Sequence, residues 1–251
     1  MINIFLYTDS PSKSLDINKL ASFLYGFNFN VEDRGDFLQY LELDEIAVNE
    51  LNRFLDNIRI TDIEKPIDDL NRKTVTSELN ENITNKNFLD GFWLQRKMYS
   101  YLYEKNSSEL NQNNLHLIIS RKLFGTFGTK RYHARVLLTG DPALISTSGI
   151  VEAPARPREY YFVKAKFLSM GKKINELDEI YKDRFVNYDD PKITNILCSY
   201  ALQQIKSKIA GEPFCENSEC CLYNSHWQEE VLILQYKNVM CDECLRILNS
   251  S

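Results

Sequence analysis

The chain has 251 residues, of which 43% are hydrophobic and 26% are charged, and its formal net charge is −5. These fractions are ordinary for a globular protein, so they exclude a disordered tail, a collagen-like repeat and a small disulfide-rich scaffold. No apolar run approaches the roughly 18 residues that a membrane span needs. The opening residues, MINIFLYTDS, lack the basic start and apolar stretch of an export signal, so we expect a cytoplasmic protein.

The first 58 residues alternate between strand-like and helix-like patterns. An apolar run at 2–7 ends in turn-forming residues and predicts a strand, and the aromatic-rich stretch 29–40 is expected to be extended. Apolar residues recur at intervals of three and four over 16–27 and 44–58, which predicts two helices. This order of strands and helices favours a layered α/β domain.

The middle of the sequence mixes connections with further elements. Residues 59–87 are polar and predict a long connection or an insertion. An aromatic-rich helix is expected at 90–104. Segment 140–159 holds three of the 7 prolines and is expected to be an ordered surface loop with a short strand at 143–146. The remaining strands are predicted at 115–119, 135–139 and 160–166.

The clearest helix follows Asp190-Pro191, after a shorter helix expected at 174–185. Aspartate is a good N-cap and proline suits the first helical position. Gly211 is typical of a helix C-cap, and Pro213 prevents the helix from continuing. Between these ends runs one apolar stripe, formed by Ile193, Ile196, Leu197, Tyr200, Ala201, Ile205 and Ile209.

Basic residues are concentrated in one block. Residues 121–173 carry a net charge of +8, whereas the segments before and after carry −7 and −6. The block is either a solvated face balanced by acidic neighbours or a site for an anion or an acidic partner. Its candidate anion- or peptide-binding residues are Arg156 and Arg158, beside a loop of small residues, and His133. The acidic balance of the whole chain disfavours nucleic-acid binding, although the basic and aromatic composition of the block keeps that alternative open.

Five of the 6 cysteines lie in the last 37 residues, and their spacing indicates a metal site. Four residues separate Cys215 from Cys220, two separate Cys241 from Cys244, and 20 lie between the pairs. Two close pairs of thiolates are how a chain builds a tetrahedral zinc site, and four sulfur ligands leave no position for water. We therefore expect one structural Zn²⁺ on these four cysteines. Cys221 and His226 are weaker candidates for ligands, and Cys198 is expected to be a core thiol that plays no part in the site.

The end of this helix and the cysteines resemble the archaemetzincins, a zinc-peptidase family of archaea and vertebrates. That family carries a helix with HExxHxxGxxHC, then x4-C-x-M, a spacer of nearly twenty residues and CxxC. The pattern Gly211-x3-Cys215-x4-Cys220-x-Leu222 and the later CxxC match it over roughly residues 190–247. The stretch RYHARVLLTGDPALISTSGIVEAPARPREYY is similar to an uncharacterised archaeal group of metallopeptidase-like proteins.

The resemblance implies a zincin-like α/β fold. Its expected parts are a mixed twisted sheet with flanking helices and a long C-terminal "active-site" helix, all within residues 1–211. A small four-cysteine zinc subdomain is expected to follow at 212–251.

The catalytic positions that the resemblance implies depart from the family's pattern. The three histidine positions hold Gln204, Lys208 and Phe214, the glutamate position holds Ile205, and the methionine position holds Leu222. A zincin needs neutral imidazoles to hold zinc and a carboxylate to deprotonate its bound water, and none of these side chains can do either. Lys208 either replaces the metal by pairing with acidic groups or carbonyls of the remnant cleft, or extends into solvent.

These departures favour a pseudoenzyme. We expect a catalytically degenerate metallopeptidase homologue that binds a peptide or protein partner through the remnant cleft and the basic loop. Two alternatives stay open: an active metal-dependent hydrolase with non-standard catalytic groups, and a nucleic-acid-associated zinc protein.

Overall fold

The computed structural model describes residues 2–9, 14–67 and 88–250. Contacts divide the chain into two compact units, the first formed by Met1–Ser10 and Phe29–Gly149 and the second by Pro11–Asn28 and Ile150–Ser251. The domain boundary expected at residue 211 stays a prediction, and the residues on both sides of it belong to the second unit. Most of the polar connection expected at 59–87 lies outside the described residues.

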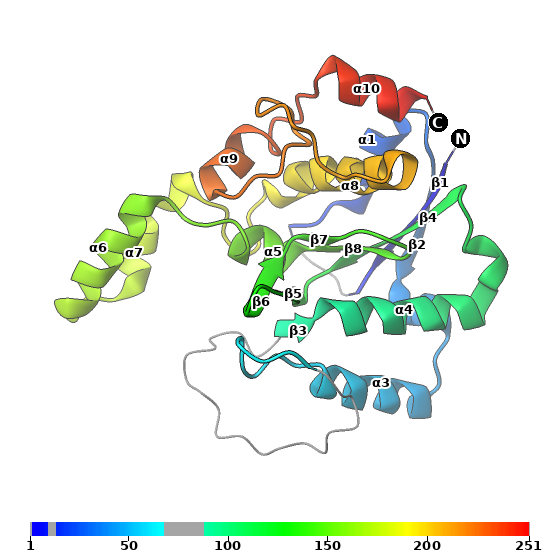
Figure 1. Ribbon diagram of the computed structural model, residues 1–251, viewed down its shortest axis with the longest axis horizontal. Helices are drawn as coiled ribbons and strands as arrows, with labels where there is room; N and C mark the ends of the chain where they lie inside the picture. Colours follow the sequence, from blue (N-terminus) through cyan, green and yellow to red (C-terminus); the bar gives the residue numbers. More distant parts are fainter. Residues whose placement is uncertain (1, 10–13, 68–87, 251) are drawn as a thin grey trace. The chain divides into compact units, whose positions relative to one another are not determined.

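The first unit is built on a five-stranded sheet with the strand order β2-β1-β4-β8-β7 (Figure 1). Strand β1 (Asn3–Thr8) pairs in parallel with β2 (Asn30–Asp36) on one side and with β4 (Asn114–Ser120) on the other. Strand β4 also pairs in parallel with β8 (Ala143–Ser146), to which β7 (Leu137–Leu138) is antiparallel. Both β4 and β8 are buried along their whole length, which explains their continuous apolar runs.

A second, three-stranded sheet in the same unit has the order β3-β5-β6. Strand β5 (Leu123–Gly128) pairs in parallel with β3 (Phe88–Asp90) and antiparallel with β6 (Arg131–Arg135). The single strand predicted at 135–139 is therefore wrong. The chain changes sheets at Val136, whose carbonyl accepts a hydrogen bond from the Ser146 amide at 2.7 Å.

Aspartates begin the main helices of the first unit. The side chains of Asp36, Asp44 and Asp90 each accept a hydrogen bond from the amide three residues later, which satisfies a donor that the first helical turn leaves open. The helices that follow these caps are α2 (Phe37–Leu41), α3 (Glu45–Asn57) and α4 (Gly91–Asn106), the last of which leads into a 3-10 turn at Ser107–Glu109. Their apolar faces and the sheet share a core that includes Tyr7, Phe37, Leu51, Leu94, Met98, Ile118 and Leu144.

A polar network crosses this core. The Arg34 guanidinium donates to the hydroxyls of Tyr7 and Tyr40, both at 2.9 Å, and to the Glu109 carboxylate at 2.6 Å. The Tyr7 hydroxyl also lies 3.0 Å from Nδ1 of His116, within hydrogen-bond distance. His116 is 1% exposed, and no hydrogen-bond partner is found for its Nε2 atom among the described residues.

The second unit is helical. Helix α8 (Ile193–Ala210) packs against both α1 (Ile17–Tyr25) and α10 (Asp242–Asn249), and from its first residue to Lys206 nearly all of its side chains are buried. Gly211 ends α8 with φ +78°, a left-handed conformation that glycine adopts without strain. The elements of this unit, with α5 spanning the boundary at Gly149, are α1 (Ile17–Tyr25), α5 (Thr147–Glu152), α6 (Arg158–Ser169), α7 (Ile174–Ile180), a 3-10 turn (Lys182–Arg184), α8 (Ile193–Ala210), α9 (Gln228–Ile233) and α10 (Asp242–Asn249).

The predicted α/β class with a mixed sheet is confirmed, but three further local predictions are wrong wholly or in part. Residues 160–166 form part of helix α6 and not a strand. In segment 140–159 the short strand predicted at 143–146 is confirmed as β8, but the segment is not a surface loop on either side of it throughout, because Thr147–Glu152 form α5. The stretch 29–40 is extended only as far as Asp36, whose cap starts α2. Within the described ranges, no helix is long and apolar enough to cross a membrane.

Candidate metal centre

Four cysteines that are distant in sequence come together in the second unit. Cys215 and Cys220 follow helix α8, Cys241 is the N-cap residue of α10, and Cys244 lies in the first turn of that helix. Their four sulfur atoms all lie within 4.8 Å of one another, and those of Cys215 and Cys241 are 3.7 Å apart. The two sequence pairs thus form one cluster, as their spacing predicted.

Backbone hydrogen bonds shape the loop that carries the first pair. The Cys215 amide donates to the Leu222 carbonyl at 2.9 Å, which closes the loop. The amides of Asn217 and Leu222 donate to the sulfurs of Cys215 and Cys220, at 3.4 and 3.5 Å. Hydrogen bonds of this kind stabilise the thiolate form, so the loop is arranged for metal-binding sulfurs.

The geometry of the cluster fits zinc. Tetrahedral coordination at a Zn–S distance of about 2.3 Å places sulfurs about 3.8 Å apart, close to the separation of the Cys215 and Cys241 sulfurs. Cys220 and Cys244 are buried and Cys215 and Cys241 half-buried, as in a closed site. Among the described residues this is the one group of three or more histidine, cysteine or acidic side chains that could hold an ion.

The neighbouring candidates lie outside this group. Cys221 is fully buried, and its thiol donates to Cys220, which lowers the pKa of Cys220 and raises that of Cys221. Cys198 is a buried residue of α8, and burial raises its pKa to about 12. His226 is exposed and its amide binds the Glu230 carboxylate at 2.7 Å. None of the three belongs to the group of possible ligands.

The positions that the resemblance aligns with catalytic residues hold side chains in different environments. Gln204 and Ile205 are buried at 1% and 0% exposure, while Lys208 and Phe214 are half-buried. The role of Lys208 as a metal substitute stays a prediction.

Another lysine of α8 makes a contact of the kind proposed for Lys208. Lys206 is 6% exposed, and its ammonium donates to the carbonyls of Glu212 and Phe214, both at 2.8 Å. Sequence reasoning missed it, because the position of these carbonyls depends on the turn at Gly211.

The candidate anion-binding residues of the basic block are partly engaged within the protein. Arg156 pairs with the Asp178 carboxylate at 2.6 Å and also donates to the Tyr160 hydroxyl. The Arg158 guanidinium lies 5.3 Å from the centre of the Trp227 ring. His133 is half-buried in β6 of the first unit. A role for these residues in binding an anion or a peptide stays a prediction.

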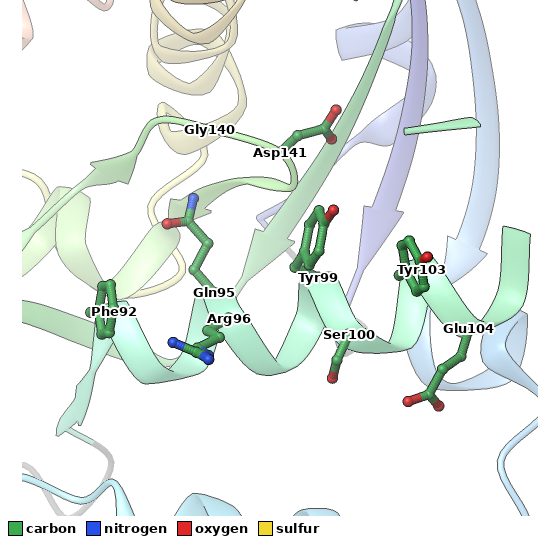
Figure 2. A pocket seen from close by; sticks show the side chains of 9 residues that line it. All are labelled: Phe92, Gln95, Arg96, Tyr99, Ser100, Tyr103, Glu104, Gly140 and Asp141. Atoms are coloured by element: carbon green, nitrogen blue, oxygen red, sulfur yellow. The ribbon is translucent and has the colours of Figure 1, made fainter. Parts of the chain in front are cut away.

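An open groove runs along α4 in the first unit, with a volume of about 590 Å³. Figure 2 shows Gln95 and Tyr99 pointing toward the loop at Gly140 and Asp141. Gln95 is fixed there by hydrogen bonds to the carbonyls of Thr139 and Pro142, at 2.9 and 2.8 Å. The exposed aromatic residues Phe92, Tyr99 and Tyr103 recur at helical spacing, and this pattern could have indicated the groove. From the sequence alone, it predicted only a helix.

The chain was compared with solved structures and with curated proteins. Two crystal structures are similar to the chain. Archaemetzincin from Methanopyrus kandleri is 10% identical with a TM-score of 0.46, over 99% of this chain and 94% of that one. A zinc-dependent peptidase from Methanocorpusculum labreanum is 13% identical with a TM-score of 0.44, over 98% of this chain and 100% of that one. A search of curated proteins finds no match.

The match to a protein family extends over the whole sequence. The Probable metallopeptidase family (DUF6775) matches residues 1–251, which include both units and all four clustered cysteines. The chain therefore belongs to this probable metallopeptidase family.

Proposed function

We propose that this chain is a catalytically degenerate member of its family that holds one structural zinc and acts by binding a peptide or protein. The observation that carries the proposal is the chemistry of the remnant positions on α8. Gln204 and Ile205 are buried where the archaemetzincin motif has its first histidine and its glutamate. An amide is a poor replacement for imidazole and an alkyl chain cannot act as a general base, so the hydrolytic step lacks its base.

The cysteine cluster supports a structural role for zinc. Four thiolates complete a tetrahedral shell, which leaves no coordination position for a water molecule or a substrate carbonyl. Bound there, zinc would cross-link the loop after α8 to the start of α10. The chain's own residues keep the thiols in reach of one another through the hydrogen bonds at Cys215 and Cys220.

The groove on α4 supports the binding of a peptide. Its exposed rings offer apolar contact area, and Arg96, Glu104 and Asp141 offer both signs of charge at its rim. Aromatic and arginine side chains contribute most to the affinity of protein interfaces. Tyr99 and Tyr103 stack with their ring centres 6.2 Å apart, which gives a continuous surface for a peptide side chain.

The metal content and hydrolytic activity of the purified full chain test the first part of the proposal. We expect native mass spectrometry to find one zinc per chain, lost in Cys244→Ser and retained in the matched variant Cys198→Ser. Peptidase activity is expected to be absent in all three proteins. Two zinc ions per wild-type chain, or hydrolysis abolished by a chelator and restored by zinc, would show instead that an active catalytic site remains.

A peptide library tests the second part. We expect a displayed library of 12-residue peptides to yield sequences that bind the wild-type chain and bind Tyr99→Ala/Tyr103→Ala at least about tenfold more weakly. Tyr25→Ala, which removes an exposed tyrosine from α1, serves as the control and should bind the same peptides normally. Equal binding to the double variant would place the peptide elsewhere. Binding only to RNA or DNA, falling steeply with salt, would favour the nucleic-acid alternative.

A further inference from the structure

A second cavity lies inside the first unit and serves none of the roles proposed above. Its volume is about 170 Å³, and helices α2, α3 and α4 enclose it together with strands β4 and β8. The cavity is partly open to solvent on the side of Lys122, whose side chain is 35% exposed, so a small molecule has a route into it. Its walls are mainly apolar, and they include Leu38, Leu51, Leu55, Met98, Ile118 and Leu144.

The cavity lies at the carboxyl ends of two adjacent parallel strands. Asp9 follows β1 and Ser120 ends β4, and both line the cavity. From β1 the chain first adds β2 on one side and later adds β4 on the other, so the strand order reverses between β1 and β4. Open α/β sheets bind ligands in the crevice outside the carboxyl ends of their strands at such a reversal.

The polar end of the cavity presents a positioned ammonium group. The Asp9 carboxylate accepts hydrogen bonds from the Ser120 hydroxyl, from the Arg121 amide at 2.9 Å and from the Lys122 ammonium at 3.0 Å. The Lys122 amide in turn donates to the Ser120 oxygen at 3.0 Å. The ammonium has three protons and Asp9 takes one, so Lys122 retains donors for a second acceptor.

We propose that this cavity binds a small monocarboxylate whose apolar body is about the size of a benzene ring or a short branched chain. A dry apolar cavity of about 150 Å³ is known to admit benzene, which sets the size of the body. The carboxylate would lie against the Lys122 ammonium, with the body among the leucines of α2 and α3. A neutral ligand of the same shape loses the charge-assisted hydrogen bond to Lys122. This site is independent of the peptide groove and of the cysteine cluster.

Calorimetric titration of the full zinc-loaded chain with 4-methylpentanoate and phenylacetate tests the proposal. We expect saturable binding of at least one acid, with the matching amide at least about tenfold weaker. Lys122→Met should weaken binding of the acid by a similar factor. The matched control is Lys65→Met, since Lys65 forms an ion pair of similar length with Asp62, at 3.1 Å, on an exposed segment. That variant should bind like the wild type.

A second variant guards against misfolding of Lys122→Met, which leaves Asp9 without its lysine. Leu55→Trp fills the cavity with a larger side chain and keeps both charged groups, so it should abolish binding of the acid while the circular dichroism spectrum is unchanged. Three results would overturn the proposal: no binding of either acid to the folded wild type at millimolar concentration, amides that bind as tightly as acids, or full affinity in a folded Leu55→Trp variant.

Discussion

At the scale of single residues, His116 gives the protein a defined dependence of stability on pH. Burial is the largest cause that lowers the pKa of His116, and the charge of Arg34 adds to it, while Asp141 and Glu109 act in the opposite direction. In the unfolded chain this pKa returns to about 6.5. The unfolded state therefore binds more protons below that pH, so the free energy of unfolding should fall as the pH decreases below about 6.5.

Replacing His116 tests this pH dependence. His116→Asn keeps a side chain that can hydrogen-bond to the Tyr7 hydroxyl but cannot titrate. Below pH 6.5 we therefore expect the free energy of unfolding of the variant to change less steeply with pH than that of the wild type, by up to about 1.4 kcal/mol per pH unit. Urea unfolding at several pH values gives the free energy of unfolding of both proteins. Any pH effect of the cysteines is common to both and cancels when the two values are subtracted. His226→Asn, at an exposed histidine, serves as the control. A slope equal to the wild type in His116→Asn would assign the pH dependence to other groups.

At the scale of elements, helix α6 shows why a short pattern can mislead. Residues 160–166 are rich in aromatic and β-branched side chains, which favours a strand within a window of seven residues. Tyr160, Val163 and Phe167 recur at intervals of three and four and pack with Leu177 and Phe185, so the longer window has helical periodicity. The N-terminal ends of α1 and α3 were predictable because Asp16 and Asp44 act as local caps.

In the candidate site, too, features fixed by local sequence were predictable and features fixed by tertiary structure were not. The spacing of Cys215, Cys220, Cys241 and Cys244 predicted the cluster, because each pair is a local unit with room for only a few arrangements. The contact of Lys206 with the segment after α8 was not predictable from the sequence. Lys206 and Lys208 both lie near the end of this helix, and either ammonium can donate to a carbonyl. Only the path of the chain after Gly211 selects which ammonium meets the carbonyls of the next segment.

The link between the end of α8 and the cysteine loop yields a prediction about stability. Lys206→Met removes a buried ammonium that donates two part-buried hydrogen bonds, to the carbonyls of Glu212 and Phe214. The substitution should lower the free energy of unfolding by about 1–3 kcal/mol. Urea unfolding with zinc present measures this loss. Lys208→Met is the matched variant on the same helix and should cost less, because the Lys208 side chain is only half-buried whereas that of Lys206 is 6% exposed. A larger loss in Lys208→Met would instead support the metal-substitute role that the sequence suggested for Lys208.

At the scale of the whole molecule, the two units should respond differently to the removal of zinc. All four clustered cysteines belong to the second unit, and the sheet with β1 and β4 belongs to the first. Structural zinc sites contribute about 10–16 kcal/mol in small zinc-binding peptides, which is comparable to the entire stability of a typical domain. Without zinc, four thiol groups remain crowded at the junction of the cysteine loop and α10, with no ligand bonds to hold them.

Hydrogen exchange followed by mass spectrometry can locate this response in the chain. Addition of a strong zinc chelator should accelerate exchange of amides in residues 212–250 and at the end of α8, while amides of β1, β4 and α4 keep their protection. Restoring zinc should reverse the change, which excludes irreversible oxidation of the thiols. Equal loss of protection in both units would mean that they unfold as one cooperative body. Unchanged protection throughout would mean that the cysteine cluster contributes little to the folded state, because local opening follows the loss of local stabilisation.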